Sequence, residues 1–320
     1  MTTPKDRPIF IVGAPRSGTT LLRFMLSSHP RIYIPHESYF IPRFFLRNPC
    51  RPMQRAQAIR VLEFILNARP FIDDWKIERP DPASFIDALP DLTPASFLDA
   101  LYSQYAGIYG AERWGDKTPT YTNYISLISE IFPKAQFIHI IRDGRDAALS
   151  ALNAYKKDRF YVDLYFAGHT WKQRVRKTRL SGSRLSSDRY FELHYEQLVA
   201  EPERLLQEIC AFLNESYAPA MAEPQQLARK LIPKRGVHSG VRKPLNNDSI
   251  GRWHHEMSVI DQRFFQMVAG DLLDELGYVR VDLGRATVAE WARYAGLMTK
   301  YNFLEGGRYF LQLLGVFNPH

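Results

Sequence analysis

The sequence predicts an α/β protein in which helices flank a central parallel sheet. A strand expected at 8–13 leads into a helix at 19–28, the apolar run AQFIHII at 135–141 precedes another helix, and RYFELHY at 189–195 reads as a further strand. Strands and helices that alternate in this way are typical of a parallel sheet covered on both faces. The 320 residues, 45% of them hydrophobic, allow a single domain over 1–320 with an ample core.

The turn after the first expected strand has the composition of a phosphate-binding loop. In IVGAPRSGTT, four residues separate Gly13 from Gly18, which is the spacing of a P-loop. Backbone N–H groups and the positive end of a helix dipole converge on one anion in such a loop. Thr19 stands where nucleotide triphosphatases have lysine, and Arg16 is the nearest cation. The loop therefore indicates a P-loop-related fold that binds a phosphorylated nucleotide, and the missing lysine argues against ATP.

Between these segments the sequence predicts mainly helices. RIYIP at 31–35 reads as a short extended piece, whereas helical periodicity and prolines over 44–111 indicate a helical insertion. Further helices are expected at 121–132 and 160–180. The tail at 285–320 is amphipathic, helical and aromatic. We expect its aromatic residues, among them Trp291, Tyr294, Tyr301 and Phe303, to pack against the core, with contact to a membrane or a partner as the alternative.

The charge of the chain favours anionic ligands. A formal net charge of +8 suits a nucleotide, an acidic substrate, a nucleic acid or a lipid surface. Basic residues cluster between 156 and 189, but the interleaved aromatic residues typical of nucleic-acid binding are missing there. We therefore interpret this cluster as a solvated helix face and expect no nucleic-acid partner.

Several classes of protein are disfavoured by what the sequence lacks. It has no apolar run of about 18 residues, so no transmembrane segment is predicted, and no signal peptide precedes the first strand. The two cysteines, Cys50 and Cys210, argue against a disulfide scaffold and a cysteine metal site and predict a cytoplasmic protein. His254 and His255 beside Glu256 make no metal site either, because adjacent helical residues point apart. Nothing in the sequence indicates an oligomeric state.

A second phosphate site is predicted after the strand at 135–141. Arg142 ends that strand, and Ser150 lies eight residues later, about two helical turns on. An arginine fork and a hydroxyl at the carboxyl end of a strand suit a phosphate. Arg142 could instead pair with Asp143 or Asp146, and Ser150 could bond within its own helix. Together with the first loop, the phosphate interpretation is favoured.

Two phosphates at opposite ends of a nucleotide describe 3′-phosphoadenosine 5′-phosphate, and the chain resembles the sulfotransferases that use 3′-phosphoadenosine 5′-phosphosulfate (PAPS). The resemblance is strongest to the tyrosylprotein sulfotransferase branch and its bacterial relatives. It is carried by the strings PRSGTTLLRFMLSSHP, HESYFIPR, WGDKTP, HYEQLVAEPERLLQEICAFL and GRWHHEMS. The resemblance implies a P-loop-containing nucleotide triphosphate hydrolase-like fold and PAPS as co-substrate, with adenosine 3′,5′-bisphosphate (PAP) as product.

The resemblance also implies which residues bind the donor. The 5′-phosphosulfate would bind the loop residues Arg16, Ser17, Gly18, Thr19 and Thr20. Arg142, Ser150 and Arg252 would bind the 3′-phosphate, with Tyr195 near the nucleotide. Tyr195 could equally be a half-buried aromatic residue of a strand.

By the same resemblance, Glu37 falls on the general base and Lys117 on the catalytic lysine. Sulfuryl transfer needs an acceptor hydroxyl that loses its proton and a leaving phosphate whose charge is neutralised. Glu37 would serve the first need and Lys117 with Arg16 the second, so no metal is required. The neighbouring His36 is the alternative base.

Structural alternatives and other functions stay open at this point. Glu37 could simply pair with Arg43, and Lys117 with Asp116. A P-loop kinase or nucleotide triphosphatase and a non-catalytic nucleotide- or polyanion-binding protein are the alternative functions. The acceptor could be a small-molecule, lipid, carbohydrate or peptide hydroxyl, with the insertion at 44–111 lining its site.

Overall fold

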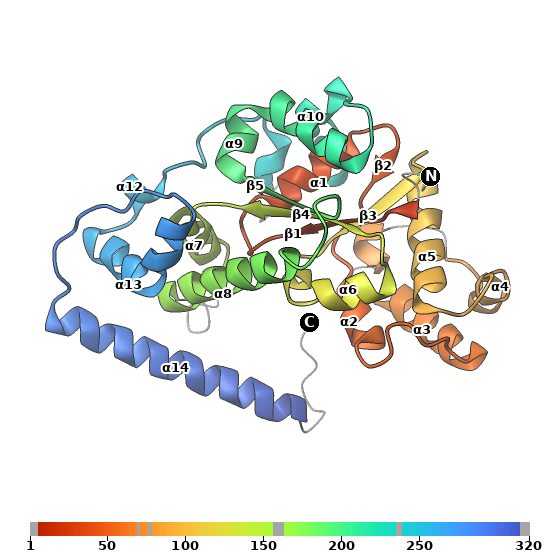
Figure 1. The fold of residues 1–320 in the computed structure, drawn as a ribbon, viewed down its shortest axis with the longest axis horizontal. Helices are drawn as coiled ribbons and strands as arrows, with labels where there is room; N and C mark the ends of the chain where they lie inside the picture. The colour runs from red at the N-terminus through yellow and green to blue at the C-terminus, as the bar shows by residue number, and fades with distance from the viewer. Residues whose placement is uncertain (1–5, 69–70, 76–78, 156–162, 235–238, 314–320) are drawn as a thin grey trace. The chain divides into compact units, whose positions relative to one another are not determined.

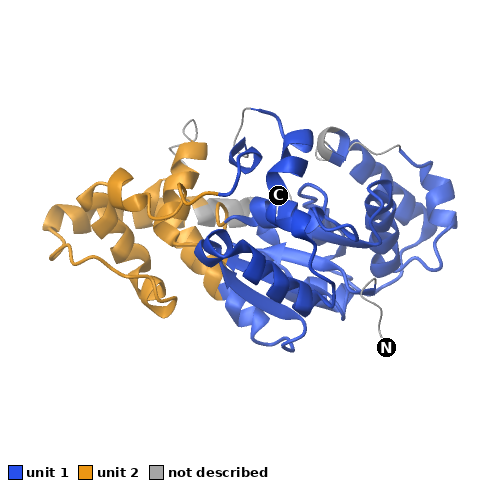
Figure 2. Ribbon diagram, turned by 90° about the horizontal axis from the view of Figure 1, so that it is seen from above, with its two compact units in different colours: residues 1–13, 18–140, 177–245 blue, residues 14–17, 141–176, 246–320 orange. Residues whose placement is uncertain are grey.

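The computed structural model describes residues 6–68, 71–75, 79–155, 163–234 and 239–313. The chain divides into two compact units (Figure 2). The first unit comprises residues 1–13, 18–140 and 177–245, and the second comprises residues 14–17, 141–176 and 246–320. Each unit is described by itself below.

The first unit is built on a five-stranded sheet with the strand order β2-β3-β1-β4-β5 (Figure 1). The strands are β1 Ile9–Val12, β2 Ile32–Tyr33, β3 Arg113–Lys117, β4 Gln136–Ile141 and β5 Tyr190–His194. β1 runs parallel to both β3 and β4, and β2 runs parallel to β3. The predicted parallel α/β architecture is therefore confirmed, including the short extended piece that forms β2.

The chain connections that follow β1 and β4 run toward opposite edges of the sheet. β1 lies between β3 and β4, and the chain leaves β1 toward β2 but leaves β4 toward β5. Ligands of open α/β sheets bind beyond the carboxyl ends of the strands at such a switch point. Gly13 follows β1 here, and a Cβ on it would lie 2.6 Å from the carbonyl oxygen of Ile140. Only glycine fits between the two strands at this position.

Helices cover both faces of the sheet (Figure 1). α1, α9 and α10 lie on one face, and α5 and α6 lie on the other, where they share a core with Phe10 and Val12 of β1. The α-helices of this unit are α1 Thr19–Ser27, α2 Phe40–Phe45, α3 Arg55–Asn67, α4 Pro82–Asp87, α5 Pro94–Ile108, α6 Ile125–Ile131, α9 Tyr195–Ala200, α10 Pro202–Leu213 and α11 Pro224–Leu231. Short turns of other helix types are η2 Phe71–Trp75, η3 Pro119–Asn123, η5 Pro219–Ala222 and η6 Ser239–Arg242.

The segment 44–111 is helical, as predicted. α4 and α5 each begin with proline after a capping side chain, because Asp81 accepts from the Ser84 amide and Thr93 from the Ser96 amide. Caps of this kind satisfy first-turn N–H groups that have no partner within the helix. The repeated pattern of a capping residue, proline, alanine and serine thus explains why both helices start where they do.

Two predicted boundaries shift. The helix expected at 121–132 is a 3₁₀ turn followed by α6, because the Tyr121 amide bonds the Thr118 carbonyl and the Tyr124 amide bonds the Tyr121 carbonyl, at 2.9 Å each. These contacts span three residues rather than the four of an α-helix. The strand expected at 189–195 ends one residue early, since Tyr195 begins α9.

The second unit is helical. It contains α7 Gly144–Ala154, the first part of α8 Leu164–Gly182, α12 Trp253–Glu256, α13 Val259–Glu275 and α14 Val288–Leu313. The helix predicted from 160 is described only from Asp163, whose carboxylate accepts from the Phe166 amide at 2.9 Å. Residues 156–162, which hold part of the basic cluster, and the tail beyond 313 lie outside the described residues.

The tail packs against the core on one side only. The rings of Tyr294 and Tyr301 in α14 lie 5.5 and 5.7 Å from that of Tyr165 in α8. Trp291 and Phe303 on the same helix are 56% and 80% exposed. The expectation that the aromatic residues of the tail are core residues is therefore correct for the two tyrosines and wrong for Trp291 and Phe303.

Candidate functional site

The glycine-bounded turn before α1 has a conformation that glycine alone adopts easily. Gly18 caps α1 with φ 96°, in the left-handed region. A Cβ on Gly18 would lie 2.4 Å from Cδ2 of Tyr195, whose buried ring covers the turn. Tyr195 therefore contacts the loop and is not a half-buried aromatic residue of a strand.

The first turn of α1 offers backbone donors. Gly18 has no side chain with which to cap the helix, and the first turn that starts with Thr19 and Thr20 contains no acidic residue. The N–H groups at the start of a helix lack intrahelical partners and attract anions. This end of α1 suits a phosphate, as the spacing of the loop predicted.

A buried ion pair lies at the carboxyl ends of β2 and β3. Lys117, the last residue of β3, donates from Nζ to Oε1 of Glu37 at 2.5 Å. The side chains are 1% and 11% exposed. Burial lowers the pKa of Lys117, and the carboxylate of Glu37 opposes that shift. The two residues predicted as base and lysine thus meet across 80 positions of sequence.

The alternative partners of this pair are engaged elsewhere. Arg43 lies over the ring of Phe64, 4.1 Å from its centroid. Asp116 is fully buried and accepts a hydrogen bond from the Tyr102 hydroxyl at 2.6 Å. Burial raises the pKa of Asp116. The two alternatives, a pairing of Glu37 with Arg43 and a pairing of Lys117 with Asp116, are therefore wrong.

The segment that carries Glu37 is held by hydroxyl groups that the sequence did not single out. The Ser38 amide donates to Oγ1 of Thr118 at 3.0 Å. The Tyr121 hydroxyl lies 2.7 Å from Oγ of Ser38 and accepts from the Ile41 amide at 3.1 Å. In KTPTY, Thr118 follows Lys117 directly and Tyr121 lies four residues after it, so their proximity to a candidate residue was the available signal.

In the second unit, the predicted phosphate residues form one hydrogen-bonded cluster. Arg142 donates from Nη1 to the carbonyl oxygen of Arg16 at 3.1 Å, and Arg16 donates from Nε to Oγ of Ser150 at 3.0 Å. Arg16 has φ 69°, which is uncommon for a residue with a side chain. Arg142 also donates to the Ser249 carbonyl and receives a bond from Trp171 on its own carbonyl. The Ser150 hydroxyl therefore has a partner outside its own helix.

The neighbouring acidic residues have structural roles. Asp143 caps α7 and pairs with Arg145 at 2.7 Å. Asp146 accepts from the amides of Gly251 and Trp253 at 2.7 and 3.0 Å. Burial raises the pKa of Asp146, and the charge of Arg142 opposes that shift. These bonds fix the segment that carries the predicted Arg252.

Two predicted donor-binding residues differ in what they already contact. The buried Oγ of Ser17 has no hydrogen-bond partner among the described residues, so this hydroxyl fits a polar ligand. Arg252 instead makes two bonds of 2.7 Å to the carboxylate of Glu256. These bonds use Nε and Nη2 and leave the N–H groups of Nη1 as further donors. Within the described ranges, no group of three or more His, Cys, Asp or Glu side chains is placed to hold a metal ion.

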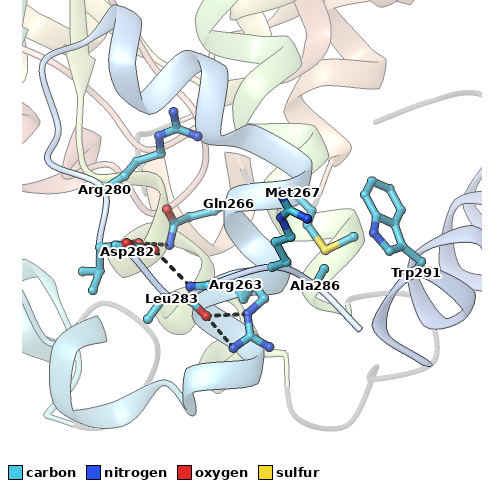
Figure 3. A pocket seen from close by; sticks show the side chains of 11 residues that line it. Arg263, Gln266, Met267, Arg280, Asp282, Leu283, Ala286 and Trp291 are labelled. Carbon is cyan, nitrogen blue, oxygen red and sulfur yellow. Dashed lines mark hydrogen bonds between the residues drawn. The ribbon is translucent and has the colours of Figure 1, made fainter. Parts of the chain in front are cut away.

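A cavity of about 640 Å³ lies in the second unit, between α13 and the segment that leads to α14 (Figure 3). Arg263 at its wall donates to the Leu283 carbonyl through Nε and Nη2 and pairs with Glu290 at 2.5 Å. These contacts hold the connecting segment against α13, so the guanidinium of Arg263 has a structural role. None of the predicted site residues lines this cavity.

The fold and the loop define a class of P-loop-related proteins that bind nucleotides at the carboxyl edge of a parallel sheet. The chain belongs to the sulfotransferase family, whose model matches residues 8–219. It is therefore an enzyme that transfers sulfuryl groups. This membership disfavours the kinase and nucleotide triphosphatase alternative and the non-catalytic alternative.

Two relatives and one solved structure illustrate the similarity. Protein-tyrosine sulfotransferase 1 of Danio rerio is 28% identical over 86% of this chain and 73% of its own length. An uncharacterized protein of Aquifex aeolicus is 28% identical over 78% of this chain, which spans only 31% of that protein. The sulfotransferase domain from the curacin biosynthetic pathway superposes with a TM-score of 0.50 at 20% identity, over 92% of this chain and 97% of that domain. This last likeness shows the shared fold.

The sequence predicted no transmembrane segment. Among the helices of the described ranges, none combines the length and the hydropathy that a membrane span requires.

Proposed function

We propose that the protein transfers the sulfuryl group of PAPS to a hydroxyl or phenol by in-line displacement, with Glu37 as general base. The observation that carries this proposal is the buried contact of 2.5 Å between Glu37 and Lys117 at the carboxyl edge of the sheet. A base and a cation held at the same edge match the two needs of sulfuryl transfer. PAPS supplies the activated sulfuryl group when it is bound.

We propose that two groups of residues bind the donor, one for each end of the nucleotide. The 5′-phosphosulfate would be bound by Arg16, Ser17, Gly18, Thr19 and Thr20, and the unpartnered Ser17 hydroxyl supports this assignment. The 3′-phosphate would be bound by Arg142, Ser150 and Arg252, and Tyr195 would lie near the nucleotide. Guanidinium groups bind phosphate through paired, charge-assisted hydrogen bonds.

The catalytic roles follow from charge. Glu37 takes the proton of the acceptor hydroxyl, while Lys117 and Arg16 neutralise the charge that develops on the leaving phosphate. The ammonium of Lys117 also stabilises the carboxylate of Glu37 through their contact at low exposure. We propose that this chemistry needs no metal.

The acceptor and the organisation of the chain are proposed more broadly. The acceptor is a hydroxyl of a small molecule, lipid, carbohydrate or peptide, and the helical segment 44–111 lines its site. The name of the Danio rerio relative makes a tyrosine phenol the first candidate to test. We propose that residues 1–320 act as one catalytic domain, and that the two free cysteines reflect a cytoplasmic protein.

The experiment measures transfer of radiolabelled sulfate from PAPS to phenol, alcohol, sugar and tyrosine-peptide acceptors. We expect Glu37→Gln to keep its affinity for PAP and to lose about 10² to 10⁴ in turnover. The matched variant His36→Gln should keep most of its turnover. A full rate in Glu37→Gln with loss in His36→Gln would assign the base to His36. Equal thermal stabilisation by PAP and ADP would contradict the assignment of the 3′-phosphate residues.

A further inference from the structure

We propose that Thr118 and Tyr121 are positioning residues, whose hydroxyls hold the main chain next to Glu37 so that its carboxylate faces Lys117. This inference rests on the proposed role of Glu37 as general base. It concerns two residues that would touch neither donor nor acceptor and would act only through Glu37.

The contacts reach both sides of the turn that follows Glu37. Thr118 accepts from the Ser38 amide at 3.0 Å, which fixes the residue directly after the base. Tyr121 accepts from the Ile41 amide at 3.1 Å and contacts the Ser38 hydroxyl at 2.7 Å. Two hydroxyls from one segment therefore hold the beginning and the end of a four-residue stretch.

The hydrogen bonds of Thr118 and Tyr121 are buried, so their loss would be costly. Thr118 is fully buried, Tyr121 is 1% exposed, and Ser38 is 6% exposed, so water does not replace a lost partner. Between the two anchors, Tyr39 has φ 59°, in the left-handed region that is unfavourable for a residue with a side chain. Such a conformation persists only where its surroundings impose it. The hydroxyls of Thr118 and Tyr121 supply that constraint.

Lys117 and the two hydroxyls also share one support. Thr118 directly follows Lys117, and Asp116 directly precedes it. The carboxylate of Asp116 accepts from the hydroxyl of Tyr102, and the ring of Tyr102 stacks on that of Trp114 with 4.4 Å between the ring centroids. The end of β3 is therefore rigid, and the same rigid segment presents the cation and anchors the base. This arrangement fixes the distance between Glu37 and Lys117 from both partners.

The test removes each hydroxyl with the smallest change of shape. Tyr121→Phe and Thr118→Val should lower kcat about tenfold and leave the affinity for PAP unchanged, whereas Thr118→Ser should keep the wild-type kcat. The control is Tyr190→Phe, since the Tyr190 hydroxyl is likewise bonded, to His139 at 2.7 Å and Glu192 at 2.9 Å. It should lose similar stability in urea and keep its kcat.

A second measurement separates positioning from general destabilisation. In the background Glu37→Gln, Tyr121→Phe and Thr118→Val should cause no further loss of kcat, because residues that act through one group are not additive. A loss of the same size in both backgrounds, or in Tyr190→Phe, would overturn the inference, as would an unchanged kcat in both single variants. If Glu37→Gln itself keeps full activity, the proposed function fails, and the inference falls with it. Should Tyr121→Phe not fold, the comparison of Thr118→Val with Thr118→Ser tests the same point.

Discussion

Replacing Gly18 by alanine should damage both stability and donor binding, by an amount that the structure allows to be worked out. Gly18 has φ 96°, and the added Cβ would lie 2.4 Å from Cδ2 and 2.9 Å from Cε2 of Tyr195. The left-handed conformation costs alanine about 1–2 kcal/mol. Alanine also lowers the conformational entropy of the unfolded chain, which offsets about 0.4–1 kcal/mol of that cost. The overlap with a buried ring adds about 1–3 kcal/mol. We therefore expect Gly18→Ala to lose about 2–4 kcal/mol of unfolding free energy.

The chain contains a matched control for this prediction. Gly110 has φ 71° and no atom within 4 Å of the position of an added Cβ, so Gly110→Ala isolates the cost of the conformation. It should lose only about 1 kcal/mol. Urea unfolding followed by circular dichroism measures both values, and PAP titration should show weaker binding for Gly18→Ala alone. A loss in Gly18→Ala no larger than in Gly110→Ala would refute the steric argument.

A double variant locates the strain. Once Tyr195→Ala has removed the ring, the further cost of Gly18→Ala should fall to the cost measured for Gly110→Ala, because only the backbone term is left. An undiminished cost in the absence of the ring would show that the turn, and not Tyr195, resists the methyl group.

Two further predictions concern other parts of the fold. Ser150→Ala removes a hydroxyl that accepts from the Arg16 guanidinium, so we expect kcat to fall about tenfold and PAP to bind more weakly. The control Ser150→Thr should keep both kcat and PAP affinity. A loss of PAP affinity alone would show that Ser150 does not position Arg16. Burial lowers the pKa of His139 in the folded protein below its usual value of about 6.5. As the pH falls below about 6.5, the unfolded chain therefore takes up a proton on this side chain while the folded protein does not, which favours unfolding. The wild type should therefore lose stability from about pH 7 to pH 5, and His139→Gln should lose less; parallel urea midpoints would contradict this.

Local patterns sufficed for the loop and for every strand except β3, whose short sequence RWGDK carries no apolar run. The apolar run of β4 and the two glycines around Arg16 mark a buried strand and a tight turn without reference to the rest of the chain. The 3₁₀ turn at Pro119–Asn123 was not predicted, since the buried Tyr121 fixes it through contacts with the segment that carries Glu37. Helical periodicity cannot report such contacts.

The site shows the same division. The loop residues were predicted from spacing, whereas Glu37 and Lys117 came only from resemblance, because nothing local reveals that residues 80 positions apart form an ion pair. Thr118 was missed altogether, since a buried hydroxyl becomes informative only when its partner is known. Conversely, Arg252 matched a family string, but its bond to Glu256 joins the N-cap residue of α12 to the last residue of that helix, four positions later.

On the proposed mechanism, the position of Lys117 explains why a P-loop without its lysine can serve a transferase. Thr19, which takes the place of that lysine, is 4% exposed at the start of α1 and offers no flexible charge. Lys117 comes instead from the end of β3, where its ammonium contacts the carboxylate of Glu37. A lysine on the loop would contact phosphate alone, whereas Lys117 also contacts the carboxylate that we propose as the base. On the proposed mechanism, the buried ammonium of Lys117 therefore takes part both in deprotonation of the acceptor and in neutralisation of the leaving group. A substitution of Lys117 would change both steps at once.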